Sequence, residues 1–221
     1  MSFLFGAQSD CPVTQRLING YNLFDWIMRK NCFPAFWGRN ILGATPISEH
    51  EITFLHNNNC KIMPIINDLK EIWVGSDDPD EGTEDALRAV EAAIKLSIPH
   101  NCDITLFAHI HSTWEPTYGW LTGYAKTIAD NGYVPGFIFG INNPIFYPDS
   151  NFIKKVKKQR CHIVSCTDSP PIQGELASWC DNTEKSNPEN ILLLRTGTTK
   201  LGNVEAHHIY AKNSSVLNHM W

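Results

Sequence analysis

The feature of this sequence that most restricts its fold is a repeated alternation of short apolar segments with amphipathic ones, joined by short connections. The short apolar segments are rich in β-branched and aromatic side chains, which is typical of buried strands. The amphipathic segments between them indicate helices. Because strand and helix alternate, we expect a parallel sheet, either closed as a barrel or open and doubly wound, and we favour the barrel.

The predicted strands extend along the whole chain, at 3–7, 35–41, 60–66, 103–110, 134–141, 161–166, 175–181, 191–196 and 204–209. A chain of 221 residues is close to the lower limit for eight full strand–helix units, so helices of the C-terminal third should be reduced. No repeat, low-complexity tract or linker divides the chain. The sequence therefore predicts an α/β fold, a TIM-type (β/α)8-like barrel, in a single domain over 1–221.

Two of the amphipathic segments carry clear helix signals. Ser48 and Glu51 have the spacing of a capping box, which predicts the start of a short helix. A longer helix is predicted to follow Gly82. Within it Leu87 and Ile94 are seven residues apart, with Val90 between them, and we expect these three side chains to form its buried stripe.

Composition and charge exclude several classes of function. The chain is 43% apolar, enough for a sizeable core, and its formal charge of −5 leaves no extended basic surface for nucleic acid. The one basic cluster, at 154–160, has the helical spacing of a solvated face. No segment is long and apolar enough to cross a bilayer. We therefore expect neither a nucleic-acid partner nor a membrane one, and the sequence does not predict the oligomeric state.

The cysteines and the N-terminal segment bear on the cellular compartment. The seven cysteines are odd in number and widely spaced, without the pairs that hold a structural zinc, which fits reduced thiols. The first ten residues have no basic leader followed by an apolar run. We expect a cytoplasmic protein, or one that is exported without a cleavable signal peptide.

Several stretches follow one another in a distinctive order: 36–39 (FWGR), 47–52 (ISEHEI), 61–66 (KIMPII) and 124–140 (YAKTIADNGYVPGFIFG). On these stretches the chain resembles the family-25 lysozymes and the bacterial glycoside-hydrolase-like barrels related to them. The resemblance covers most of residues 1–141. The C-terminal part matches more loosely, through Trp179 and the turn at 202–205.

This resemblance implies a site at the C-terminal ends of the strands, where acids on the first, fourth and last strands handle a sugar. The matching positions here carry Gln8 on the first strand, and His109 and His111 on the fourth. Glycoside hydrolysis ordinarily uses two carboxyl groups, and two imidazoles offer no negative charge to an oxocarbenium ion. If the family chemistry is kept, another acid has to supply it.

The candidate catalytic residues lie at or just beyond predicted strand ends. Glu115, in the loop after the fourth strand, and Asp168 are candidate replacement acids. His109 and His111 are two apart, so in a strand they would share one face, pointing into the barrel opening. The residues expected to bind substrate are polar, or are tryptophans whose faces stack on sugar rings: Gln8, Asp10, Arg39, Trp73, Trp114, Trp179 and Glu205.

These residues leave three functions open. The first is a glycoside-hydrolase-like domain that recognises, and with a replacement acid hydrolyses, a glycan such as bacterial cell-wall peptidoglycan. The second is an inactive glycan-binding or interaction barrel. The third is a metal-dependent hydrolase in which His109 and His111 bind a divalent metal, completed by His207, His208 or Asp168. Apart from that metal no cofactor is expected, because the sequence has no glycine-rich phosphate loop.

Overall fold

The computed structural model describes residues 4–30, 33–140, 151, 161–166, 191–211 and 213–221. The strand predicted at 175–181 and the basic cluster at 154–160 lie outside these residues. None of the described helices is both long and apolar enough to span a membrane.

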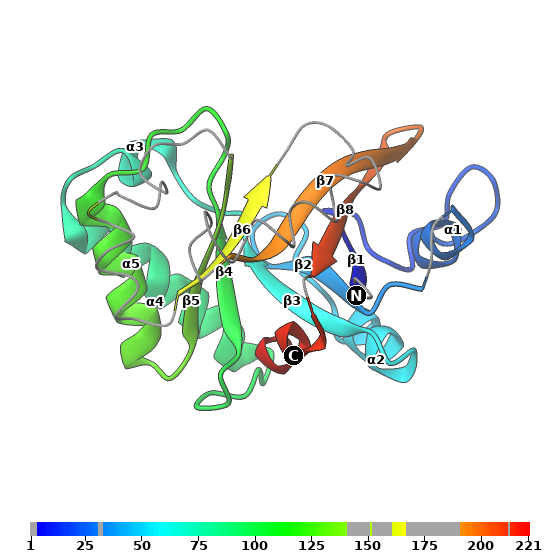
Figure 1. The fold of residues 1–221 in the computed structure, drawn as a ribbon, viewed down its shortest axis with the longest axis horizontal. Helices are drawn as coiled ribbons and strands as arrows, with labels where there is room; N and C mark the ends of the chain where they lie inside the picture. The colour runs from blue at the N-terminus through cyan, green and yellow to red at the C-terminus, as the bar shows by residue number, and fades with distance from the viewer. Residues whose placement is uncertain (1–3, 31–32, 141–150, 152–160, 167–190, 212) are drawn as a thin grey trace.

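The described strands pair in chain order in one curled sheet (Figure 1). Strands β1 to β7 are each parallel to their neighbours, whereas β8 is antiparallel to both β7 and β1, so that the pairing returns to the first strand. The strands are β1 (Leu4–Gln8), β2 (Phe36–Leu42), β3 (Lys61–Ile66), β4 (Thr105–His109), β5 (Val134–Gly140), β6 (His162–Cys166), β7 (Ile191–Leu201) and β8 (Val204–Ala211).

The antiparallel β8 corrects the expectation of an all-parallel sheet. β7 and β8 form a hairpin whose turn contains Gly202, in the left-handed region at φ 62°. Such a short turn can join only antiparallel strands, since a parallel pair needs a long crossover. The reduction of helix in the C-terminal third is confirmed for this connection. The sheet is therefore not a regular (β/α)8 barrel, although its strands lie where the sequence predicts them.

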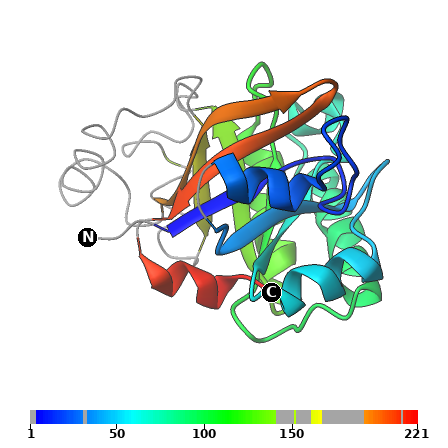
Figure 2. The same ribbon diagram turned by 90° about the vertical axis from the view of Figure 1, so that its right-hand side faces the viewer.

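The helices cover different parts of the sheet. In Figure 1, α4 and α5 lie side by side, and α1 lies at the opposite end of the molecule. Figure 2 shows the C-terminal 3₁₀ helix, in red, along one end of the sheet. The helices are α1 (Leu23–Lys30), α2 (Glu49–Asn57), α3 (Glu71–Val74), α4 (Pro79–Lys95), α5 (Tyr118–Asp130) and the 3₁₀ helix η2 (Ser214–His219).

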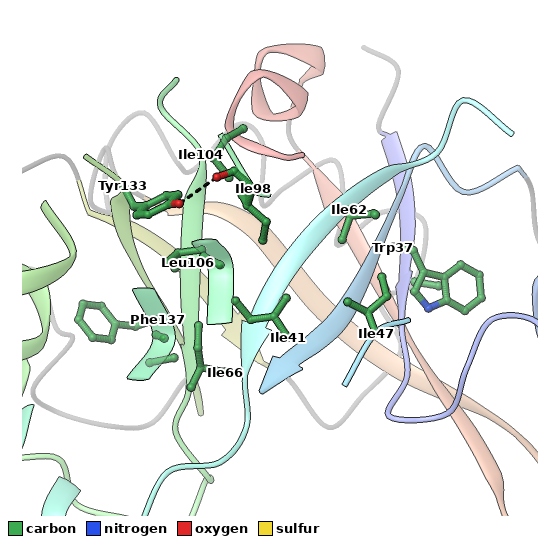
Figure 3. Packing of buried hydrophobic residues seen from close by; sticks show 14 of the residues in the cluster. Trp37, Ile41, Ile47, Ile62, Ile66, Ile98, Ile104, Leu106, Tyr133 and Phe137 are labelled. Carbon is green, nitrogen blue, oxygen red and sulfur yellow. Dashed lines mark hydrogen bonds between the residues drawn. The ribbon is translucent and has the colours of Figure 1, made fainter. Parts of the chain in front are cut away.

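The convex face of the sheet packs against the α-helices. Figure 3 shows part of this core, in which Ile62, Leu106 and Phe137 are completely buried. Tyr133 brings a polar atom into the same cluster, and its hydroxyl donates a 2.9 Å hydrogen bond to the carbonyl of Ile98. The apolar area removed from water here is the main force that holds the helices on the sheet.

The concave face holds a second apolar cluster, separate from the first. It consists of inward-pointing side chains of the strands, capped by Val216 and Met220 at and after η2: Phe36, Met63, Ile65, Phe107, Ile138, Leu193, Ile209 and Ala211. Glycines make room for the aromatic rings, because a Cβ at Gly6 would lie 2.3 Å from the Phe36 ring. The cluster fills the N-terminal part of the concave face, which leaves the C-terminal ends of the strands for other side chains.

A buried ion pair joins β2 to α2. Arg39 is completely buried, with its Nε 2.9 Å from Oε1 of Glu51 and its Nη2 3.2 Å from Oε2. Arg39 also donates to the carbonyls of Ser9 and Asp10. Glu51 is the residue that completes the capping box with Ser48, so the predicted box is confirmed. One carboxylate thus caps α2 and fixes β2 to the segment after β1.

The pKa of Glu51 reflects the same contacts. Burial alone would raise it, but the hydrogen bonds and charge of Arg39, together with the backbone N–H groups of Val13 and Ser48, outweigh burial and hold it below its usual value. The carboxylate is therefore ionised at neutral pH, and its attraction to Arg39 is lost as the pH falls through the lowered pKa.

We predict that Arg39→Met lowers the free energy of unfolding by about 3–5 kcal/mol, because it leaves Glu51 buried without its cation. Urea denaturation measures this change. The matched control is Lys126→Met, which breaks the exposed pair between Lys126 and Asp130 and should cost less than about 1 kcal/mol. Equal losses of unfolding free energy in the two variants would show that the buried pair contributes no more to stability than the exposed one.

The buried face of α4 differs from the predicted stripe. Leu87 and Ile94 are 45% and 61% exposed, so the expectation that they are buried was wrong, and only Val90 lies on the buried face. The contact with α5 is made by small residues instead. A Cβ at Gly82 would lie 2.0 Å from the carbonyl oxygen of Trp120, and one at Gly123 would lie 2.0 Å from that of Pro79. Close approach of the two backbones therefore decides which face is buried.

We predict that Gly123→Ala lowers the free energy of unfolding by about 1–3 kcal/mol, since the added methyl group has to push α4 and α5 apart. Thermal or urea denaturation measures it. Gly75→Ala is the control, because Gly75 has right-handed φ and the nearest atom to an added Cβ is 3.3 Å away. A loss no larger than that of the control would contradict the close helix contact.

Candidate functional site

Above the apolar cluster of the concave face lies a layer of polar side chains. His109 stands two positions beyond Phe107 on β4, and Arg195 two positions beyond Leu193 on β7. Since alternate residues of a strand face the same side, both side chains follow the inward direction of the apolar residues below them. The same argument places His207 on the antiparallel β8, where it pairs in register with Gln8 of β1. We call Gln8, His109, Arg195 and His207 the inner polar cluster.

Arg195 connects the members of this cluster. Its Nη1 lies 3.2 Å from Oε1 of Gln8 and 3.3 Å from Nε2 of His109. The other ring nitrogen of His109, Nδ1, lies 3.1 Å from Oδ1 of Asn67, just after β3. A guanidinium only donates, so Nε2 of His109 accepts from Arg195 and Nδ1 carries the proton that is donated to Asn67. The surroundings thus select one neutral tautomer of His109.

Burial and charge keep the two histidines of the cluster neutral. Burial lowers the pKa of His109 to about 3, and the positive charge of Arg195 adds to this effect. Burial also lowers the pKa of His207, with Arg195 acting in the same direction and Glu205 and Asp10 opposing it. Near neutral pH, His109 therefore accepts hydrogen bonds at Nε2 and has no proton to give as an acid.

The carboxylates predicted at the site lie around this cluster and have partners of their own. Asp10 is exposed and accepts a 2.9 Å hydrogen bond from Nδ2 of Asn40. Glu205 lies 2.9 Å from Nζ of Lys200, across the β7–β8 hairpin, and its Oε1 is 3.8 Å from Nε2 of His207. The hydrogen bond from Lys200 holds the pKa of Glu205 below its usual value, so this carboxylate is ionised.

The segment after β4 lies outside the inner polar cluster. β4 ends at His109, so His111 lies beyond the strand that was predicted to carry both histidines. His111 is exposed, with Nδ1 2.9 Å from the hydroxyl of Thr113 and its ring 6.0 Å from that of Trp114. Glu115 is exposed in the same loop.

The remaining predicted site residues are distributed elsewhere. Arg39 is completely buried against Glu51, on the convex side, and serves the scaffold. Trp73 is half-buried in α3, with Nζ of Lys70 3.8 Å from its ring centre. Asp168 and Trp179 lie outside the described residues. The structure therefore brings Gln8 and His109 together, with Asp10 and Glu205 near His207.

The geometry around His109 bears on the predicted metal. Both of its ring nitrogens already have partners, Asn67 and Arg195. Within the part of the chain that the structure describes, no group of three or more His, Cys, Asp or Glu side chains is arranged to hold a metal ion. His207 and His208 are paired instead with hydroxyls, of Thr198 and Thr199.

Sequence reasoning missed Arg195, the residue that links the cluster. A signal was present, because Arg195 is a single cation in the apolar strand sequence ILLLRT, spaced two positions from Leu193. The same spacing argument that selected His109 would have placed Arg195 on the inward face. Asn67 carried no comparable signal, since it lies beyond the end of its strand.

Comparisons with known proteins bear on the fold. The sequence matches no protein-family model and no curated protein. An uncharacterized B. stearothermophilus protein has a TM-score of 0.72 at 21% identity, over 99% of this chain and 100% of that one. The Mycobacterium tuberculosis Tat-secreted protein Rv2525c, solved in complex with L-tartrate, scores 0.61 at 13% identity, over 97% and 98%. The modular autolysin LytC of Streptococcus pneumoniae scores 0.52 at 12% identity, over 93% of this chain and 46% of that one. The chain shares its fold with these proteins.

We predict that NMR titration finds His109 neutral down to a pH of about 3, and that Arg195→Met raises its pKa because the variant removes a nearby positive charge. The unfolded pKa is about 6.5, so the unfolded chain binds more protons between these values, and acidification weakens the fold there. An inflection of the His109 ring signals near pH 6.5 in the wild type would contradict the burial and tautomer derived above.

Proposed function

We propose that this chain is a reduced TIM-type, glycoside-hydrolase-like domain that recognises a glycan at the inner polar cluster and does not cleave it with a carboxylate pair. One observation supports this most strongly. The three positions that match acids in the enzymes it resembles carry Gln8, His109 and His111, and the side chains of Gln8 and His109 are hydrogen-bonded to Arg195.

Electrostatics supports recognition over hydrolysis at this cluster. Glycosidic cleavage needs an acid to protonate the leaving oxygen and a negative charge beside an oxocarbenium-like transition state. His109, with a pKa of about 3, supplies no proton near neutral pH, and Gln8 carries no charge. The cation of Arg195 would repel the positive charge that develops on the sugar ring. The charges of the cluster thus disfavour glycosidic cleavage.

The same groups are well suited to bind a sugar. A guanidinium hydrogen-bonds to hydroxyls in several directions, and Arg195, held at Nη1 by Gln8 and His109, has Nη2 and Nε without a partner among the described residues. Two proteins of similar fold are in keeping with this proposal, since LytC is an autolysin and Rv2525c was solved with L-tartrate, a polyhydroxylated acid. A bacterial cell-wall glycan is the ligand we propose.

Hydrolysis by a relocated acid is the second candidate. The observation in its favour is the ionised Glu205, 3.8 Å from His207 at the border of the inner polar cluster. Glu115 and Asp168 are further candidate acids. In either case export would bring the chain to a cell-wall ligand, and the Tat-secreted neighbour is in keeping with export.

Calorimetric titration with soluble cell-wall glycan fragments, alongside an assay for released reducing ends, tests this proposal. We predict binding without turnover, weakened about 3- to 10-fold by Gln8→Leu, which removes one hydrogen-bonding group and keeps the volume. Lys126→Gln, an exposed change on α5, should bind as the wild type does. Turnover that disappears in Glu205→Gln or Glu115→Gln would contradict the proposal and identify the enzyme's acid.

A further inference from the structure

Arg195 is a half-buried cation whose hydrogen-bonding partners are both neutral. The partners that the structure gives it are Oε1 of Gln8 and Nε2 of His109. Arg195 forms no ion pair with any residue in the described ranges, 4–30, 33–140, 151, 161–166, 191–211 and 213–221. A charge that is partly removed from water and lacks a counterion is costly, so such an arrangement is uncommon unless a ligand supplies the missing charge.

The other shielded arginines of the described chain do have carboxylate partners. Arg39 is paired with Glu51, and Arg88 lies against the carboxylates of Asp68 and Asp85. Among the described residues, two carboxylates near the inner polar cluster are also engaged, because Glu205 pairs with Lys200 and Asp10 accepts from Asn40. Arg195 therefore differs from the rest of the fold in a way that packing alone does not explain.

The way Arg195 is held leaves it ready to bind an anion. Both of its hydrogen bonds use Nη1, so Nη2 and Nε have no partner among the described residues. Gln8 and His109 fix the plane of the guanidinium from two different strands. A planar guanidinium with two free donors matches the two oxygens of a carboxylate, which it binds with two parallel hydrogen bonds.

The surrounding groups do not cancel this charge. His109 and His207, which face Arg195 from β4 and β8, are neutral near pH 7 because burial lowers the pKa of each. Gln8 is an uncharged amide on β1. The inner polar cluster thus carries a net positive charge that comes from Arg195 alone.

We propose that Arg195 makes this site selective for glycans that carry a carboxylate on the sugar, which its guanidinium binds as the missing counterion. The inference rests on the proposed glycan-binding function and adds the chemical class of the ligand. It makes Arg195 a specificity-determining residue and assigns it no role in bond cleavage.

The test compares an acidic cell-wall oligosaccharide with the same oligosaccharide after its carboxylates have been reduced to alcohols, by calorimetric titration. We expect the wild type to bind the acidic form about 10- to 100-fold more tightly, the range for a hydrogen bond to a charged group. Arg195→Gln should bring this ratio close to one. Arg195→Lys, which keeps a point charge without the planar fork, should keep part of it, and Lys126→Gln should keep all of it.

Three results would overturn the inference, and they are distinguishable. Equal affinity of the wild type for both oligosaccharides leaves glycan recognition standing and removes the role of Arg195. Binding of neither oligosaccharide contradicts the proposed function itself. Binding of acetate or inorganic phosphate alone, as tightly as the acidic oligosaccharide, indicates a general anion site. Circular dichroism shows whether Arg195→Gln is folded. If it is not, the two affinities of the wild type still test the preference for a carboxylate.

Discussion

The two-residue pleat of the strands is the constraint on which both core and site depend. On the concave face it stacks inward side chains in levels, apolar from Phe36 and Met63 up to Phe107 and Ile138, and polar at the C-terminal ends of the strands. The change from apolar to polar within one strand, Phe107 to His109, needs no special backbone geometry. The apolar cluster and the inner polar cluster above it are therefore carried by the same strands, so the hydrogen-bonding side chains are held by the sheet itself.

Arg195 determines the chemical character of that surface. By donating to Gln8 and His109 it fixes an amide and a single imidazole tautomer, and its charge helps to keep His109 neutral. These properties disfavour a cationic transition state and favour hydroxyl and carboxylate groups. Under the proposed function, the electrostatics of this one side chain is what would distinguish the chain from a glycoside hydrolase of similar fold, because a fold does not fix its function.

The sequence predicted the parts of the fold that depend on local patterns. Apolar runs located each described strand, and the spacing of Ser48 and Glu51 located the start of α2, because pleat and capping are properties of neighbouring residues. It failed where two distant segments decide the outcome. The face of α4 is chosen by the close contact of Gly82 with α5, and no periodicity within α4 reports that contact, so Leu87 and Ile94 were misplaced.

The candidate site shows the same division. Gln8 and His109 were named because they match acid positions of the family that the sequence resembles, whereas His111, named for the same reason, lies beyond the end of β4. The link through Arg195 joins β1, β4 and β7, and a contact between strands so far apart in sequence leaves no local pattern. The direction of β8 was missed because the alternation of strand and helix had suggested a parallel sheet throughout.

The most direct test of glycan recognition without carboxylate-pair chemistry is a crystal structure of the protein with an acidic cell-wall oligosaccharide. We predict an uncleaved sugar at the inner polar cluster, with its carboxylate about 2.7–2.9 Å from the guanidinium of Arg195. A cleaved sugar with Glu205 or Glu115 beside its anomeric carbon, or an oligosaccharide bound away from Gln8 and His109, would contradict it.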